Sequence, residues 1–245
     1  MSGIVSFGNV ASPTSTSDPY FSNVSLLIHG DGINNSKVIQ DSSPNNFTIT
    51  RIGNTSISNS QLPFGSISFD GSGDYLTIPY NNAFNWQNSN YTIESWVYAS
   101  SFSTWSLGAS PYYPVMIGSF DPVGTGNTWG FGPISTNKLC FGYYSGVNNV
   151  YSWKTVISTA SLTTRQWNHI VTCLSSTGVV TLFVNGVLDT QSSIQATLVS
   201  PGTSLVIGQL NSRSLSGELR EIRITKGIQR YTQTFTLPST PFPDN

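Results

Sequence analysis

The stretch VVTLFVNGVLDTQ, residues 179–191, decides the fold class of this chain. It places Asn185-Gly186 between two runs of apolar and β-branched residues. A two-residue type I′ turn needs positive φ at both central positions, and Asn followed by Gly is the preferred pair for it. The stretch therefore predicts a tight β-hairpin.

Runs similar to the two arms of this hairpin recur along most of the chain, separated by Gly, Asn, Ser and Pro, and helical periodicity fits almost nowhere. So many short strands at this spacing predict an all-β protein in which two sheets enclose the core. The predicted strands are 24–29, 47–51, 66–70, 75–78, 91–99, 115–120, 128–131, 139–144, 154–158, 167–174, 179–184, 187–191, 205–208 and 218–225.

The composition narrows the class of protein further. The 245 residues are 38% hydrophobic and 12% aromatic, which is enough for a packed core, whereas only 9% are charged. Surfaces built on neutral polar groups suit extracellular or virion proteins. A net charge of -1 argues against a nucleic-acid partner. No apolar run approaches the length of a membrane span, and residues 1–22 do not resemble a signal peptide.

Cys140 and Cys173 both lie in strand-like runs. We expect buried, reduced thiols, with a single disulfide as the alternative. The run RQWNHIVTC, residues 165–173, alternates and places His169 among apolar neighbours. Because no Ser or Cys nucleophile pattern accompanies it, His169 is predicted to be a buried, hydrogen-bonded structural histidine rather than a catalytic base.

The segment GELREIRITKGIQRYTQTF, residues 217–235, concentrates charge in a chain that has little of it. Its apolar positions are Leu219, Ile222 and Ile224. They are separated by three and then two residues, whereas a regular strand requires two and two. A β-bulge near Arg220 and Glu221 would restore the register. The charges are then interpreted as the solvent face and bulge of a final strand, and a charged binding site is the alternative.

Six segments, in this order, carry a resemblance to a known family. They are SLLIHGDG (25–32), the loop Asp41–Asn46, SISFDGSGDYLTIP (66–79), NYTIESWVYAS (90–100), RQWNHIVTCLSSTGVVTLFVNGVLD (165–189) and GELREIRITKGIQRYTQTFTLPSTPFP (217–243). The chain resembles the laminin-G-like branch of the concanavalin A-like lectin/glucanase superfamily, especially the versions found in tailed-phage structural proteins. The resemblance covers roughly residues 20–243 and implies a jelly-roll sandwich of two curved antiparallel sheets.

The resemblance also implies a structural calcium ion near the first loop, the loop at residues 41–46 and the last strand. Oxygen ligands at the matching positions would come from Asp31, Asp41, Asn46 and Glu221. Where relatives usually read Asp-Glu, this chain has Arg220 before Glu221. The alternative is therefore that the Arg220 guanidinium replaces the ion by pairing with Asp31 or Asp41.

Glycoside hydrolases belong to the same superfamily, but their chemistry needs two carboxyl groups roughly 5 Å or 6.5–9.5 Å apart. This chain has only the glutamates Glu94, Glu218 and Glu221, and they form no Glu-x-Asp-x-x-Glu run. Asp70 and Asp74 flank a Gly-Ser-Gly turn, where their side chains are expected to cap backbone amides. We predict that the chain is not an enzyme.

Aromatic residues are concentrated in the middle of the chain, including the loop-like segment 101–114. Three roles stay open for them: packing in the core, a protein interface, or a platform for a glycan. The candidate ligand-binding residues are Trp105, Tyr112, Tyr113, Trp129, Tyr144 and Tyr151.

The two ends of the chain differ from its centre. Residues 1–20 are predicted to form an extended N-terminal arm, residues 21–235 the sandwich, and residues 236–245 an extended C-terminal strap with polyproline character. Both ends are expected to bind partners.

These features favour a non-enzymatic structural protein on the virion surface of a tailed phage, assembled in the host cytoplasm. The preferred role is a capsid decoration or cement protein that binds capsid or tail subunits through its N-terminal arm, with a homo-oligomer left open. The alternatives are a tail or fibre adhesin, or a free carbohydrate-binding module that recognises a host surface polysaccharide. Neither nucleic acid nor a membrane is expected as a partner.

Overall fold

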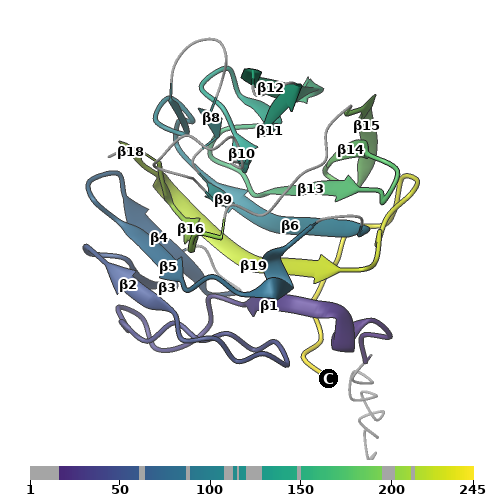
Figure 1. Cartoon of the computed structure of the whole chain (residues 1–245). Coiled ribbons are helices and arrows are strands. Elements are labelled where there is room, and N and C mark those ends of the chain that lie inside the picture. Colours follow the sequence, from purple (N-terminus) through teal and green to yellow (C-terminus); the bar gives the residue numbers. More distant parts are fainter. Residues whose placement is uncertain are drawn as a thin grey trace, which may run out of the picture.

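Two antiparallel sheets packed face to face form the body of the protein (Figure 1). The computed structural model describes residues 17–60, 64–86, 89–107, 113–114, 116–119, 129–147, 150–194, 202–210 and 213–245. Every strand that pairs within these residues does so in the antiparallel sense. The predicted all-β jelly-roll sandwich is therefore confirmed.

One sheet has eight strands. Its order is β15 (Val187–Ser193), β14 (Val179–Val184), β13 (Asn168–Leu174), β6 (Tyr91–Tyr98), β19 (Ser216–Lys226), β4 (Ser66–Asp70) and β3 (Ser56–Ser58), with β1 (Val24–Ile28) also paired to β19. One edge of β19 pairs with β6, and its other edge pairs first with β4 and then with β1. This strand therefore holds the sheet together.

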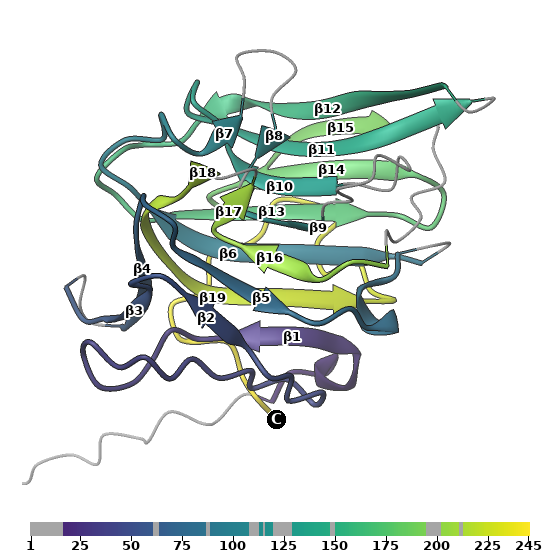
Figure 2. The ribbon, with the colours of Figure 1, turned by 60° about the vertical axis from the view of Figure 1, so that its left-hand side comes forward.

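The second sheet has seven strands and packs against the first (Figure 2). Its order is β12 (Val150–Ser161), β11 (Lys138–Val147), β10 (Trp129–Pro133), β9 (Ile117–Ser119), β16 (Leu205–Ile207), β5 (Tyr75–Ile78) and β2 (Thr50–Ile52). The minor elements are η1 (Phe21–Asn23), η2 (Asn82–Phe84), β7 (Ser106–Leu107), β8 (Tyr113–Pro114), β17 (Gln209–Leu210) and β18 (Arg213–Ser214). Every predicted strand overlaps an observed one. The unpredicted strands β3, β7, β8, β17 and β18 have two or three residues, which is too short for alternation to be visible.

The β14–β15 hairpin forms as its sequence predicts. Asn185 and Gly186 both have positive φ, at 51° and 77°. The turn is also tied to the sheet, because the backbone N–H of His169 donates to Asn185 Oδ1 over 2.9 Å. The Asn-Gly pair thus fixes both the hairpin and its register against β13.

The core lies between the sheets. Ile93 and Ile224 from the eight-stranded sheet and Phe131 and Ile207 from the seven-stranded sheet belong to one fully buried apolar cluster. Burial of such side chains contributes roughly 1.5–3 kcal/mol each, so this layer supplies much of the stability.

The cysteines are buried free thiols, as predicted. Burial raises the pKa of both, that of Cys173 to about 11, so the unreactive thiol form dominates at neutral pH. The turn between Asp70 and Asp74 also agrees with the sequence, because Asp70 accepts a hydrogen bond from the Ser72 amide and Asp74 accepts one from the Asp70 amide.

The predicted bulge is present in β19. Arg220 lies opposite Trp96 and Arg223 lies opposite Glu94, so two residues of β19 face the single residue between them, and Glu221 has a φ of 52°. The predicted exposure of the charged face is wrong, however. Arg220, Glu221 and Arg223 are all buried, because a later part of the chain covers them.

The covering element is the C-terminal segment, residues 227–245, which turns back from β19 and ends beside β1 (Figure 1, Figure 2). Phe235 N–H donates to Gly186 O over 2.9 Å, and Phe242 N–H donates to Glu221 Oε2 over 2.7 Å. Phe242 is buried. The C-terminal segment therefore packs on its own domain, and its binding to a partner stays a prediction.

The N-terminal boundary also differs from the prediction. Residues 1–16 lie outside the described range, whereas Asp18 belongs to the folded domain. Asp18 is buried, its N–H donates to Asn245 O, and its carboxylate pairs with Arg223 and Arg230. Residues 17–20 are therefore part of the sandwich and not of an arm.

Candidate functional site

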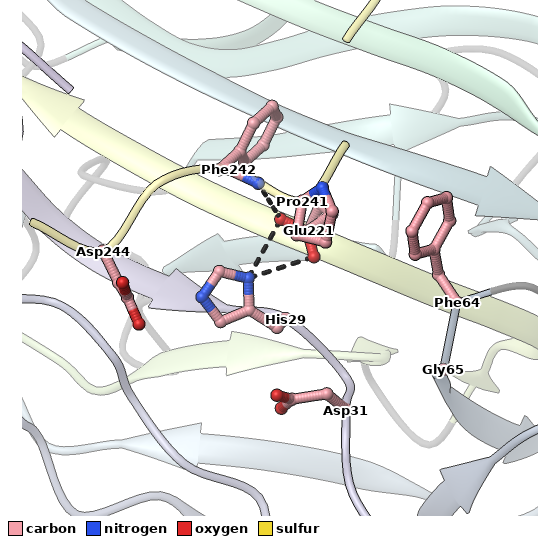
Figure 3. Close-up of a pocket in the computed structure, with 8 residues that line it drawn as sticks. All are labelled: His29, Asp31, Phe64, Gly65, Glu221, Pro241, Phe242 and Asp244. Carbon is pink, nitrogen blue, oxygen red and sulfur yellow. Dashed lines mark hydrogen bonds and ion pairs between the residues drawn. The ribbon is translucent and has the colours of Figure 1, made fainter. Parts of the chain in front are cut away.

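A pocket opens where the C-terminal segment crosses the bulge of β19 (Figure 3). Its volume is about 370 Å³, within the size range of roughly 300–1,000 Å³ that is usual for small-molecule sites. The lining residues come from four separate parts of the chain. They are His29, Asp31, Phe64, Gly65, Glu221, Pro241, Phe242 and Asp244.

The position of the pocket follows from a change of partner along β19. Leu219 pairs with Ile67 of β4, whereas Ile222 pairs with Ile28 of β1, so one neighbouring strand replaces the other at the bulge. The chain must leave β1 abruptly there. Gly30 allows this with a φ of 82°, and a Cβ at Gly30 would lie 2.9 Å from Ser66 Cα.

The floor of the pocket is a link between three segments (Figure 3). His29 Nδ1 lies 3.0 Å from each carboxylate oxygen of Glu221. The same carboxylate accepts the N–H of Phe242, which joins β1, β19 and the C-terminal segment. Burial alone would lower the pKa of His29, but the hydrogen bond that the ring donates to Glu221 and the charges of Glu221, Asp31 and Asp244 raise it above its ordinary value.

The wall of the pocket presents two further carboxylates and an aromatic ring. Asp31 and Asp244 are exposed and make no hydrogen bond or ion pair with any described residue. Phe64 is half-buried and lies at the other end of the pocket, across from Asp244 (Figure 3). The site thus offers hydrogen-bond acceptors on one side and a flat apolar surface on the other.

The residues predicted to hold calcium are only partly brought together. Asp31 and Glu221 line the pocket, whereas Asp41 is buried elsewhere and its carboxylate accepts the backbone N–H groups of Leu27, Ser43 and Phe47. Asn46 is exposed.

In the described part of the chain, no three His, Cys, Asp or Glu residues lie close enough together to hold a metal ion, and the three predicted carboxylates form no such group. Calcium binding stays a prediction, which melting with and without a chelator tests. Arg220 pairs with neither Asp31 nor Asp41, so the proposed replacement of the ion by a salt bridge is wrong.

The predicted aromatic platform is not a single surface. Trp105 and Trp129 are buried between the sheets, where Trp105 packs on Phe102 and Trp129 packs on Trp86, so their assignment to an exposed ligand site is wrong. Their size fills the inter-sheet space. Tyr144 is half-buried and packs edge-on against Trp153.

The structure describes the other three candidates only in part. Tyr113 and Tyr151 lie in β8 and β12, and Tyr112 lies outside the described residues. The pocket instead uses Phe64, which stood outside the aromatic-rich middle of the sequence.

Glu94 belongs to a second, closed cluster under the C-terminal segment. It is fully buried, and its carboxylate accepts hydrogen bonds from Arg223 Nε at 2.9 Å and from the Tyr231 hydroxyl at 2.9 Å. His169 Nε2 lies 3.4 Å from Glu94 Oε2. His169 is buried as predicted, but its ring nitrogens make no hydrogen bond with the described residues. Glu94, His169 and Arg223 are buried, Tyr231 is half-buried, and the cluster packs the C-terminal segment on the sheet.

Comparison with known families gives a clear assignment. Residues 70–228 match the family model described as the concanavalin A-like lectin/glucanases superfamily. The chain belongs to this superfamily. The matched segment runs from the end of β4 through most of the eight-stranded sheet, and the resemblance to a laminin-G-like, lectin-like sandwich is thereby confirmed.

A search of curated proteins finds no match to the chain. Several solved structures, in contrast, have a similar fold. The binding domain of Paraclostridial Mosquitocidal Protein 1 has a TM-score of 0.65 at 14% identity, over 84% of this chain and 49% of that one. The botulinum neurotoxin serotype G binding domain gives 0.59 at 14% identity, over 82% and 47%. The botulinum neurotoxin DC binding domain, solved with rat synaptotagmin II, gives 0.58 at 17%, over 84% and 48%. The chain spans about half the length of these structures.

Several residues of the pocket were not predicted from the sequence of this superfamily member. His29, Phe64, Phe242 and Asp244 are far apart in the chain and meet only because the C-terminal segment returns to β1. The one available signal was the motif SLLIHGDG, which contains His29 beside the predicted Asp31. Across the described residues, every helix is too short or too polar to span a bilayer.

Proposed function

We propose that this domain binds a saccharide in the pocket between His29 and the C-terminal segment, and does not cleave it. One observation carries the proposal: Asp31 and Asp244, whose carboxylates have no hydrogen-bond or ion-pair partner among the described residues, line the same pocket as the ring of Phe64 (Figure 3). Carboxylate oxygens accept hydrogen bonds from sugar hydroxyls, and an aromatic ring packs against the apolar face of a pyranose. The lectin-like fold adds support, since the similar structures named above are binding domains by name.

The absence of cleavage is inferred from the state of the glutamates. Glu94 is buried in ion pairs, and Glu218 accepts hydrogen bonds from the hydroxyls of Ser60 and Ser66. Glu221 is held by His29 and the Phe242 amide. Glycoside hydrolysis requires one carboxyl group as an acid and another as a nucleophile or base. No glutamate of this chain is free for either role, so cleavage would have to use Asp31 and Asp244, and the test for released sugar covers that case.

The proposal is tested by calorimetric titration, after a glycan array has identified a ligand. Replacing Asp31→Asn removes an acceptor charge, and Phe64→Ala removes the ring. Each should weaken binding about tenfold or more, since a hydrogen bond to a charged group contributes roughly 1.5–3 kcal/mol and 1.4 kcal/mol is tenfold. The matched controls are Asp70→Asn and Tyr80→Ala, which change an exposed aspartate and an exposed aromatic residue outside the pocket.

Unchanged affinity in both pocket variants, or an equal loss in the controls, would contradict the proposed site. Failure of every glycan to bind would contradict the saccharide. Release of sugar from any bound oligosaccharide would contradict the non-enzymatic assignment.

The phage-virion role is a separate proposal that rests on the six-segment resemblance alone. In it, the domain decorates a capsid or tail and is held there by residues 1–16. Deleting these residues should abolish binding to purified particles while leaving the folded domain unchanged by circular dichroism. Full retention on the particles would remove this proposal and leave the saccharide site untouched.

A further inference from the structure

Three arginines lie on the outer face of the eight-stranded sheet, and one of them differs from the others. Arg223 pairs with Glu94 and Asp18, and Arg230 pairs with Asp18. Arg220 makes no ion pair with any described residue, although it is only 8% exposed. Its sequence neighbour Glu221 is turned away by the bulge onto His29 and Phe242.

The residues around Arg220 hold its side chain in place but offer no hydrogen-bond acceptor to its buried Nη1 atom. Its guanidinium carbon lies 4.4 Å from the ring centre of Trp167, 5.1 Å from that of Phe64 and 5.4 Å from that of Trp96. Its Nη1 atom is buried and has no hydrogen-bond partner among the described residues. Aromatic faces attract a cation but accept no strong hydrogen bond, so a charged donor is left without an acceptor. Buried donors of this kind are rare and require an explanation.

A small cavity lies beside this guanidinium. Its volume is about 10 Å³. This is about the smallest cavity that holds one water molecule or one oxygen atom of a ligand. It is lined by Trp96 and Arg220 of the sheet and by Pro238–Pro241 of the C-terminal segment. It shares Phe64, Glu221 and Pro241 with the large pocket, so the two spaces adjoin.

We propose that Arg220 recognises a carboxylate, and that the ligand of the pocket is a sugar acid. This rests on the proposed saccharide function. The pyranose ring lies in the large pocket against Phe64, and one oxygen of its carboxylate enters the small cavity and accepts a hydrogen bond from Arg220 Nη1. Hydroxyls at the far end of the ring donate to Asp31 and Asp244.

The charges at the two ends of the pocket agree with this orientation of the sugar acid. The buried end holds a cation whose Nη1 has no hydrogen-bond partner among the described residues and whose nearby negative charge is Glu221, whereas the exposed end holds two carboxylates without partners among the described residues. A hexuronic acid has the complementary pattern, with one anionic group on a ring whose other substituents are hydroxyl donors. Arg220 is pre-positioned by three rings, so little side-chain order is lost on binding.

The test compares methyl galacturonide with methyl galactoside on the full chain, by calorimetry or by shifts of backbone amide resonances. The wild-type protein should bind the acid at least about tenfold more tightly than the neutral glycoside, since a charge-assisted hydrogen bond contributes roughly 1.5–3 kcal/mol. Arg220→Met should remove this preference and retain the binding of methyl galactoside. Arg213→Met changes an exposed arginine and should leave the preference unchanged.

The outcomes separate the inference from the function on which it rests. Equal binding of both glycosides to the wild-type protein overturns the role of Arg220, with a water molecule filling the cavity, and leaves the saccharide site standing. Binding of neither glycoside, with no other sugar bound, overturns both. Competition by acetate or phosphate as effective as that by methyl galacturonide shows a general anion site and overturns the sugar acid.

A second measurement keeps the inference falsifiable if Arg220→Met is poorly folded. Because the guanidinium has no hydrogen-bond acceptor among the described residues of the free protein, Arg220→Met should lose only its contacts with the rings, and its urea midpoint should fall by less than that of Glu94→Gln. Adding methyl galacturonide should raise the midpoint of the wild-type protein alone. A fall in the midpoint of Arg220→Met as large as that of Glu94→Gln, with no stabilisation of wild type by the acid, assigns Arg220 to packing and overturns the proposal.

Discussion

The two faces of β19 are both buried, but by opposite chemistry. Its inner face, with Leu219, Ile222 and Ile224, packs on apolar side chains of the seven-stranded sheet. Its outer face presents Arg220 and Arg223, which the C-terminal segment and its neighbours cover. An apolar face is buried wherever it finds another apolar face, whereas a charged face is buried only if partners of the opposite charge arrive with the cover. Burial of the outer face therefore requires specific ion-pair partners, whereas burial of the inner face requires only apolar contacts.

The comparison is tested most strongly by Glu94→Gln, which keeps the shape of the side chain and removes its charge. Arg223 and Arg230 then have only Asp18 as an anionic partner among the described residues. Breaking a buried ion pair costs roughly 3–5 kcal/mol, and we expect a loss of this size in the free energy of unfolding measured with urea. Glu218→Gln is the matched control, because Glu218 pairs with serine hydroxyls and should cost at most about 1.5 kcal/mol. Equal losses would mean that the charge of Glu94 is unimportant.

The same variant predicts a change in acid sensitivity. Burial alone would raise the pKa of Glu94, but the charges of Arg223 and Arg230 and the nearby His169 ring lower it from 4.5 to about 2. A carboxyl group with a lowered pKa stabilises the folded state above its unfolded pKa and loses this contribution as the pH falls. The wild-type protein should lose stability between pH 4.5 and about 2. Glu94→Gln should show a flatter curve over that interval.

The inner face was predictable from the sequence and the outer face was not. The spacing of Leu219, Ile222 and Ile224 was sufficient to locate the bulge, because an apolar pattern records which way each side chain points. The burial of Arg223 depends on Asp18, which is 205 residues away along the chain. No local pattern records such a contact, so the charges were interpreted as solvent-exposed.

The candidate site shows the same limit. Asp31 and Glu221 were predicted as neighbours from the resemblance, and they do line one pocket. Trp105 and Trp129 were named as candidate ligand-binding residues while packing in the core was left open, and both fill the core. Composition indicates that aromatic residues are available but does not indicate which side of a sheet they occupy. Phe64 became a candidate only through contacts between distant segments, and Arg220 was expected to pair with Asp31 or Asp41 rather than to lie among aromatic rings.

A smaller effect is expected at the hairpin that supports the C-terminal segment. Gly186 has a φ of 77°, and a Cβ there would lie 2.5 Å from Phe235 O. Gly186→Ala should therefore cost roughly 1–2 kcal/mol for the left-handed backbone, plus the displacement of the C-terminal segment. Gly73→Ala is the matched control, with a φ of 75° and no atom near its added methyl group among the described residues.

The difference between these two glycine variants in urea unfolding isolates the contact with the C-terminal segment. Amide exchange at Phe235, whose N–H bonds to Gly186 O, should become faster in Gly186→Ala alone. Equal losses of unfolding free energy in the two variants, with unchanged exchange at Phe235, would show that the hairpin does not hold the C-terminal segment. Other contacts would then have to hold this segment over the outer face of β19.

The smallest effect concerns His29, where the outer face meets the pocket. Its pKa is raised despite burial, because Glu221, Asp31 and Asp244 favour the protonated ring. A histidine with a raised pKa stabilises the folded state fully below its unfolded pKa, 6.5, and this contribution is lost as the pH rises through the folded value. Stability should therefore fall above pH 6.5 in the wild-type protein. We expect a fall of at most about 1 kcal/mol, as for a partly exposed ion pair.

His29→Gln should remove this dependence, and the other histidine of the chain, His169, is retained in both proteins as an internal reference. The measurement is the urea midpoint on either side of pH 6.5. Because Glu221 also accepts the Phe242 amide, loss of the proton from His29 should loosen the C-terminal segment first, and exchange of the Phe242 amide should increase at the same pH. Parallel midpoints and pH-independent protection of Phe242 would mean that the cover is held by the buried arginines alone, and that the pocket titrates without effect on the fold.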